Sequence, residues 1–189
     1  MEAFAAAAVM VTLAELGDKT QLLAMAFAAK YKWTIVMEAI LFATVLNHGL
    51  AVLCGTYLGD FLPAATMQVI ASAAFIIFGL WTIKGDTLDD EAEKVYYNPF
   101  MTVAIAFFLA EMGDKTQFAT ITLAAQYHQF LPVLAGTTTG MLLADGIGII
   151  VGVVLHKTIP AKALKYIAAA IFIGCGVAGL WLGYTGRVI

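Results

Sequence analysis

The chain has 189 residues, of which 62% are hydrophobic and only 12% are charged, and its mean hydropathy is +0.90. This composition excludes an ordinary water-soluble domain and indicates an integral membrane protein, with the lipid bilayer as its surroundings. The net charge of −3 gives no sign of a nucleic-acid partner, and we expect none.

Six apolar segments follow one another along the chain, each long enough to cross about 30 Å of hydrocarbon as a helix. We expect them at residues 3–29, 34–58, 65–83, 99–125, 131–155 and 161–184. The residue Glu2 leads directly into an alanine-rich run without a basic region, so we expect the first segment to remain in the mature protein. The predicted fold class is an all-α integral membrane protein with six transmembrane helices.

The basic residues predict how these helices are oriented. The connectors after the first, third and fifth segments share one side of the membrane, and they contain Lys30, Lys32, Lys84, Lys94, Lys157, Lys162 and Lys165. The other side has only Arg187. Because basic residues of short loops stay in the cytoplasm, we expect a multi-pass protein of the bacterial inner membrane with both termini on the non-cytoplasmic side.

One octapeptide occurs twice. The sequence AELGDKTQ covers residues 14–21, and AEMGDKTQ covers residues 110–117, 96 positions later. A weaker match at a shift of 97 aligns His48 with Asp145. This repetition predicts that the chain consists of two similar halves.

Each half holds three of the predicted helices. We expect the first repeat at residues 1–84 and the second at residues 99–189, joined by an acidic cytoplasmic connector at residues 85–98. An odd number of spans makes the second repeat enter the membrane from the opposite face. Such inverted repeats in transporters place the substrate site near the midplane, where the two copies meet.

The octapeptides place charged residues near the middle of apolar segments. Inserting such a residue at the centre of a transmembrane helix costs about 2.5–3.5 kcal/mol. These groups must therefore face inward, pair, hold protons or bind a cation. On a continuous helix, residues three apart lie about 60° apart on one face. We therefore predict a site of four carboxylates for metal and protons, formed by Glu15, Asp18, Glu111 and Asp114.

The position of Lys19 is open to two interpretations. Four residues after Glu15, it would lie on nearly the same face of a regular helix and could pair with that carboxylate. Alternatively, Gly17 breaks the helix and turns Lys19 away, which would free backbone carbonyls as ligands. The residues that we expect to support the four carboxylates are Gln21, Gln117, Thr20, Thr116, Lys19, Lys115, Asn47 and Asp145.

The donor atoms of this site are carboxylate, amide and hydroxyl oxygens, without thiolates. Such a set suits hard divalent ions, namely Ca²⁺, Mn²⁺ and less readily Mg²⁺. Because four carboxylates would carry too much negative charge in a low dielectric, some should take up protons when the metal leaves. The alternative, structural ion pairs within a bundle, would not require the same residues to recur in the same order.

The segments ELGDKT and EMGDKT resemble the membrane family defined by two Glu-x-Gly-Asp-(Lys/Arg)-(Thr/Ser) motifs, which includes a bacterial manganese exporter and Golgi calcium/manganese transporters. The similarity covers essentially the whole chain. It implies a cation/proton antiporter that exports Mn²⁺ or Ca²⁺ from the cytosol and has no resident cofactor, since the metal is the substrate. It also implies that Glu15, Asp18, Glu111 and Asp114 are the metal ligands and proton carriers.

Other function classes fit the sequence less well. A passive cation or proton channel would use the same acids, but an inverted repeat favours alternating access. The sequence has no HExxH, GxSxG or GxxxxGK[ST] segment, so we expect neither an enzyme nor an ATP-driven pump. Glycines at GxxxG spacing, such as Gly55 and Gly59, allow close helix approach within one chain or in a homodimer.

Overall fold

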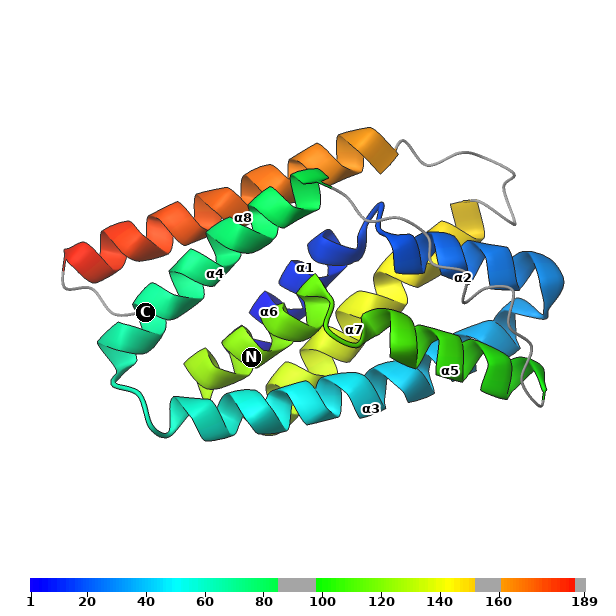
Figure 1. Cartoon of the computed structure of the whole chain (residues 1–189), viewed down its shortest axis with the longest axis horizontal. Helices are drawn as coiled ribbons and strands as arrows, with labels where there is room; N and C mark the ends of the chain where they lie inside the picture. Colours follow the sequence, from blue (N-terminus) through cyan, green and yellow to red (C-terminus); the bar gives the residue numbers. More distant parts are fainter. Residues whose placement is uncertain (85–97, 152–160, 186–189) are drawn as a thin grey trace.

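The computed structural model of the chain describes residues 1–84, 98–151 and 161–185 (Figure 1). Within these ranges the secondary structure is helical and contains no strand, which confirms the all-α prediction. The helices are α1 (Glu2–Glu15), α2 (Lys19–Lys30), α3 (Trp33–Gly59), α4 (Ala64–Lys84), α5 (Pro99–Glu111), α6 (Lys115–Tyr127), α7 (Phe130–Ile149) and α8 (Ala161–Tyr184). The predicted acidic connector lies, apart from its last residue, outside the described residues.

Four of the described helices are long and apolar enough to cross a membrane. They contain the spans Trp33–Gly59, Ala65–Ile83, Phe130–Ile149 and Tyr166–Tyr184. These spans match four of the six segments expected from the sequence. The chain is therefore a multi-pass membrane protein.

The remaining two predicted segments are each divided into two helices. The segment at residues 3–29 consists of α1 and α2, with 14 and 12 residues, and the segment at 99–125 consists of α5 and α6, with 13 residues each. A helix of this length spans only about 20 Å. Each of these two apolar segments is therefore interrupted, as one of the two interpretations of Lys19 required, and both interruptions fall within the repeated octapeptides.

The main helix contacts join the first half of the chain to the second. The helix α1 packs along α7, α3 packs along α6 and α5, and α4 packs along α8. Figure 1 shows the last pair running side by side. The helices α2 and α7 are also in contact. Because these contacts cross between the halves, the two copies of the octapeptide are brought into one bundle.

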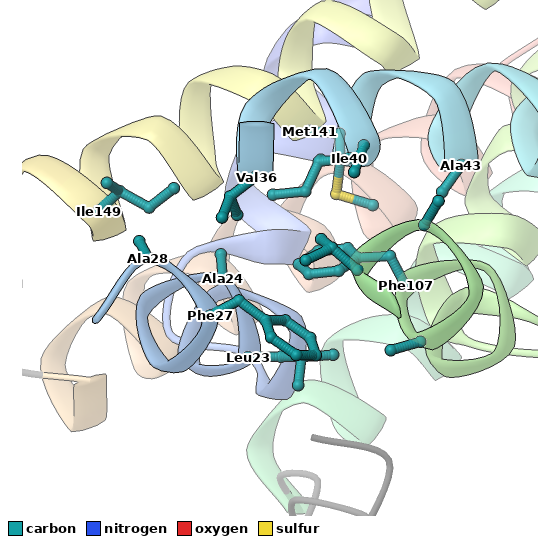
Figure 2. Close-up of a cluster of buried hydrophobic side chains, with 14 of the residues drawn as sticks. Leu23, Ala24, Phe27, Ala28, Val36, Ile40, Ala43, Phe107, Met141 and Ile149 are labelled. Carbon is teal, nitrogen blue, oxygen red and sulfur yellow. The ribbon is translucent and has the colours of Figure 1, made fainter. Parts of the chain in front are cut away.

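A cluster of apolar side chains fills the space between α2, α3, α5 and α7 (Figure 2). The rings of Phe27 and Phe107 are its largest members, and both are almost fully buried. Around them lie smaller residues of α3 and α7, including Ile40 and Met141. In a water-soluble protein, burying each large apolar side chain stabilises the fold by about 1.5–3 kcal/mol. Within a lipid bilayer, close packing of the helices provides the stabilisation instead.

Large apolar side chains also cover the outside of the helices. Leu53, Leu131 and Trp181 expose 57%, 72% and 67% of their surface. Exposed apolar residues on this scale would be unfavourable in water. They suit a surface in contact with hydrocarbon, in agreement with the membrane-spanning character of the long helices.

Candidate functional site

Each octapeptide forms a break between two short helices. The helix α1 ends at Glu15 and α2 begins at Lys19, and the glycine between them, Gly17, has a φ angle of +81°. In the second copy, Gly113 has a φ angle of +78°. This left-handed conformation costs other residues about 1–2 kcal/mol, which explains the glycine at both places.

These breaks change the predicted positions of the carboxylates. Glu15 is the last residue of α1, whereas Asp18 is the N-cap residue of α2, so the two do not share a face of one helix. Glu111 and Asp114 are related to α5 and α6 in the same way. The expectation of a pair on a continuous helical face was wrong. Of the two interpretations of Lys19, the helix break is the one that the structure contains.

A glutamine closes each turn. The backbone N–H of Gly17 donates a hydrogen bond to Oε1 of Gln21 at 2.9 Å, and that of Gly113 donates to Oε1 of Gln117 at 2.7 Å. These bonds satisfy a backbone donor that the helix break would otherwise leave without a partner. The repeated glutamine therefore has a structural role in both copies.

The same breaks place a buried acid at each of four helix ends. Glu15 and Glu111 lie at C-terminal ends, where backbone carbonyls carry partial negative charge and favour a cation. Asp18 and Asp114 lie at N-terminal ends, where partial positive charge favours a carboxylate. The Asp18 side chain also accepts a hydrogen bond from the backbone N–H of Lys19 at 2.8 Å. Each copy thus combines one glutamate in a negative environment with one stabilised aspartate.

The acidic side chains of both copies are buried. Glu15 and Glu111 are at most 1% exposed, and Asp18 and Asp114 are at most 5% exposed. Neither oxygen of Glu15 has a hydrogen-bond partner among the described residues. Glu15 lies close enough to Glu111 and Asp18 for their charges to act on it. The structure therefore gathers negative groups from both octapeptides in one region.

An ion pair joins the two copies. The ammonium of Lys115, at the start of α6, binds Oδ2 of Asp18, at the start of α2, and both side chains are almost fully buried. Lys19, the counterpart of Lys115, is only half-buried. The two copies are thus alike in backbone but different in the placement of their lysines.

Hydrogen bonds connect each octapeptide to a long helix of the other half. The side-chain amide of Gln117 donates to Oδ1 of Asn47 on α3 at 2.7 Å, and Asn47 donates to the carbonyl of Phe108 at 3.3 Å. The side-chain amide of Gln21 donates to the carbonyl of Ala144 on α7 at 2.6 Å. Positions 47 and 144 are 97 apart, so these two connections occupy equivalent places in the repeat.

The threonines of the octapeptides are buried beside the acids. Thr116 donates a hydrogen bond from its hydroxyl to Oε2 of Glu111. Thr20 is fully buried, and its side chain lies close enough to Glu111 to interact with the same carboxylate. Both residues bring a neutral oxygen near the carboxylates.

Asp145 on α7 belongs to the same group of charges. It is fully buried, neither of its oxygens has a hydrogen-bond partner in the described ranges, and it interacts electrostatically with Glu111 and Asp18. His48, its counterpart on α3, is also fully buried, and neither ring nitrogen has a partner among the described residues. The fifth acid therefore makes the region chemically unequal between the two halves.

The gathered acids do not form a tight coordination shell in this conformation. Among residues 1–84, 98–151 and 161–185, no three His, Cys, Asp or Glu side chains are arranged closely enough to hold a metal ion together. The Lys115 ammonium binds Asp18, and the charges of Glu15 and Asp114 also act on it. Coordination by several of these carboxylates would require side-chain movement from the described positions.

Two parts of this region were not predicted from the sequence. The carbonyls of Phe108 and Ala144 accept hydrogen bonds from Asn47 and Gln21, and no sequence signal marks a backbone acceptor. The pairing of Lys115 with Asp18 was also missed, because helical spacing suggests lysine pairs within one octapeptide only. The repeat at a shift of 96 is the signal that could have suggested a pair between copies.

The chain is similar in sequence to several proteins of known name. The chain is 38% identical to a Vibrio cholerae protein named "Putative manganese exporter", over 92% of this chain and 88% of the relative. It is 30% identical to a GDT1-like protein of Synechocystis sp., over 96% of this chain and 98% of the relative. It is also 27% identical to an Arabidopsis thaliana protein named PAM71-homolog, chloroplastic, over 90% of this chain and 56% of the relative. No solved structure matches the chain significantly.

The family comparison covers nearly the whole sequence. Residues 3–90 and 99–187 both match the family described as divalent cation/proton antiporter GDT1, so each half of the chain matches it separately. Each matched region contains one copy of the octapeptide, in agreement with the resemblance inferred from the two motifs. The chain therefore belongs to the GDT1 family of divalent cation/proton antiporters.

Proposed function

We propose that this protein exports a divalent cation, Mn²⁺ in preference to Ca²⁺, from the cytosol in exchange for protons. The family description names cation/proton antiport, and the Vibrio cholerae relative is named a manganese exporter. The oxygen-rich side chains of the octapeptides suit these ions better than zinc or copper. The metal is a transported substrate, and no resident cofactor is required.

We propose that the chain crosses the inner membrane six times as two inverted three-helix repeats, residues 1–84 and 99–189. In this interpretation α1 with α2, and α5 with α6, are two interrupted crossings. The equivalent contacts of α1 with α7 and of α5 with α3 support this relation, as does the contact between α4 and α8. The distribution of lysines supports non-cytoplasmic termini and a cytoplasmic connector at residues 85–98.

The transported ion and the protons are proposed to share Glu15, Asp18, Glu111 and Asp114. The observation that carries this proposal is the burial of these four acids, from both copies, in one region. Several ionised carboxylates cannot remain together in a low dielectric without compensating positive charge. A divalent cation supplies that charge, and protons replace it when the cation leaves.

Other buried groups support this exchange. The carbonyl ends of α1 and α5 point partial negative charge toward the region and favour a cation. Asp145 adds a fifth carboxylate from α7. Neutral oxygens come from Thr20 and Thr116, while Asn47, Gln21 and Gln117 fix the octapeptides against α3 and α7. Alternating access follows if these contacts rearrange on one side of the membrane at a time.

Exchange by purified protein in proteoliposomes tests this proposal. We expect Glu15→Gln and Asp114→Asn to reduce Mn²⁺-driven proton movement to the level of protein-free vesicles, because each removes a proton-carrying ligand. Glu38→Gln, at an exposed acid on α3, is the matched control and should keep wild-type exchange. Unchanged exchange in both site variants would refute the carboxylate site. Mn²⁺ flux that is ohmic, unsaturable and unable to drive protons uphill would identify a passive channel instead.

A further inference from the structure

Lys115 is the cation that the fold itself places among the acids. It is only 3% exposed, it binds Asp18, and the charges of Glu15 and Asp114 also act on it. One ammonium thus interacts with acids from both octapeptides. A lysine buried to this extent must be compensated by fixed negative charge, which these carboxylates supply.

We propose that Lys115 is a positioning residue that competes with the transported cation for Asp18, and that Lys19 does the same at Asp114 in the conformation open to the opposite side. The inference rests on the proposed carboxylate site and adds an intramolecular competitor to it. In this inference Lys115 does not bind the metal and does not carry the transported proton. It acts only by occupying Asp18.

The competition follows from the positions of the charges. Oδ1 of Asp18 accepts the backbone N–H of Lys19, and Oδ2 binds the Lys115 ammonium. A divalent cation bound to the same carboxylate would lie within a few ångströms of that ammonium and be repelled by it. Asp18 can therefore coordinate the cation only when the Lys115 ammonium moves away from it. Because the lysine is attached to α6, its withdrawal couples cation binding to a change at the start of that helix.

The second part of the inference comes from the inequality of the two lysines. Lys19 and Lys115 are 96 positions apart and each follows an N-cap aspartate, yet Lys19 is half-buried and Lys115 is buried. Inverted repeats exchange conformations when a transporter changes the side to which it opens. After such an exchange, Lys19 would occupy the buried position and Lys115 the half-buried one.

The helix packing supports the same inequality. The helix α1 packs more extensively on α7 than its counterpart α5 does on α3, and α6 packs more extensively on α3 than its counterpart α2 does on α7. The helices α1 and α6 are therefore held more closely than α5 and α2. In the proposed exchange, the described conformation is one of two unequal arrangements, and the two lysines trade positions in the other.

Equilibrium Mn²⁺ binding to the full chain in lipid nanodiscs tests the competition directly. We expect Lys115→Gln to bind Mn²⁺ about tenfold more tightly, because the competing charge is gone. We expect exchange turnover to fall at the same time, since release from the site is no longer assisted by the lysine. Lys115→Arg keeps the charge and should stay close to wild type in both measurements. Lys30→Gln, at an exposed lysine that ends α2, is the matched control.

A merely structural role predicts the opposite sign, because damage to the site weakens Mn²⁺ binding. Wild-type or weaker binding by a monodisperse Lys115→Gln protein would overturn the inference. Asp18→Asn separates this result from failure of the proposed function. If Asp18→Asn abolishes Mn²⁺ binding while Lys115→Gln leaves it unchanged, the carboxylate site stands and the competition is refuted. If Asp18→Asn binds Mn²⁺ normally, the site itself is refuted.

The mirrored role of Lys19 has its own measurement. In proteoliposomes with one protein orientation, the KM for Mn²⁺ can be determined separately from each face. We expect Lys115→Gln to lower the KM on one face and Lys19→Gln to lower it on the opposite face. A decrease on the same face for both variants, or on neither face, would overturn the exchange of roles between the two lysines.

Discussion

Gln21 and Gln117 hold the two helix breaks in the same way, because each amide oxygen accepts the backbone N–H of the glycine four residues before it. Their amide nitrogens then differ in partner. One donates to the carbonyl of Ala144, and the other donates to the side chain of Asn47. A common turn is thus attached to two different long helices, which fixes where the neighbouring acids lie.

The left-handed glycine of the second turn should be intolerant of a side chain. An added Cβ at Gly113 would meet no atom within 4 Å, so its φ angle of +78° is the only obstacle to alanine. We expect Gly113→Ala to lower the free energy of unfolding by about 1–2 kcal/mol. Gly49→Ala is the matched control, since Gly49 has equal space within α3 and a helical backbone, and alanine there should be neutral or stabilising. Thermal unfolding in detergent compares the two, and equal stability would contradict the strain argument.

The close contact of α1 with α7 depends on glycine for space. An added Cβ at Gly136 would lie 2.5 Å from the carbonyl oxygen of Phe4, which is backbone and cannot turn aside. We expect Gly136→Ala to destabilise the protein by about 1–3 kcal/mol through overpacking. Gly174→Ala on α8 meets no atom within 4 Å and serves as the control. A thermal transition unchanged by Gly136→Ala would show that α1 moves away at little cost.

The fifth acid should affect cation affinity. Asp145 is fully buried and interacts electrostatically with Glu111 and Asp18, so Asp145→Asn removes negative charge from the region without changing side-chain volume. We expect the KM for Mn²⁺ to rise about tenfold, which corresponds to about 1.4 kcal/mol of lost attraction. Glu38→Gln changes an exposed acid of the other half and should leave the KM unchanged. Saturation curves for Mn²⁺ uptake by proteoliposomes provide the comparison.

Transport should depend on pH in one direction on the loading side. Protons and Mn²⁺ compete for the same carboxylates in the proposed mechanism, so a lower pH fills more of these groups with protons and leaves fewer for the metal. The KM for Mn²⁺ should therefore rise as the pH falls, by up to about tenfold per pH unit for each proton displaced. A KM independent of pH would contradict direct competition.

Most residues of the candidate site could be proposed from the sequence because the octapeptide that contains them occurs twice. The same residues recur 96 positions apart, and the cost of placing charge in an apolar segment then draws attention to Glu15, Glu111 and their aspartates. The sequence could not show whether the helix is broken at Gly17, because glycine occurs both inside helices and in left-handed turns. The partner of Lys115 also required the fold, since Asp18 reaches it through helix packing rather than through sequence spacing.

The arrangement of the long helices was only partly predictable. Their apolar length identified four spans, but the same measure merged α1 with α2 and α5 with α6, because the surrounding residues remain hydrophobic through each break. Hydropathy measures how favourably a segment transfers from water into the membrane. It contains no information on the backbone angles of a single residue within the segment. Three charged residues in or next to each break were the visible sign, and their exact geometry depends on Gly17 and Gly113.

In the proposed six-crossing topology, the interruption of a membrane crossing near its middle has a mechanical consequence. A continuous helix of about 27 residues would tilt as one body, so that all of its packing contacts would change at the same time. Two rods of 14 and 12 residues joined at Gly17 can pivot separately, so one leaflet can rearrange while the other keeps its packing. The hinge and the charged groups are neighbours in the chain, and a small rotation there shifts the acids themselves.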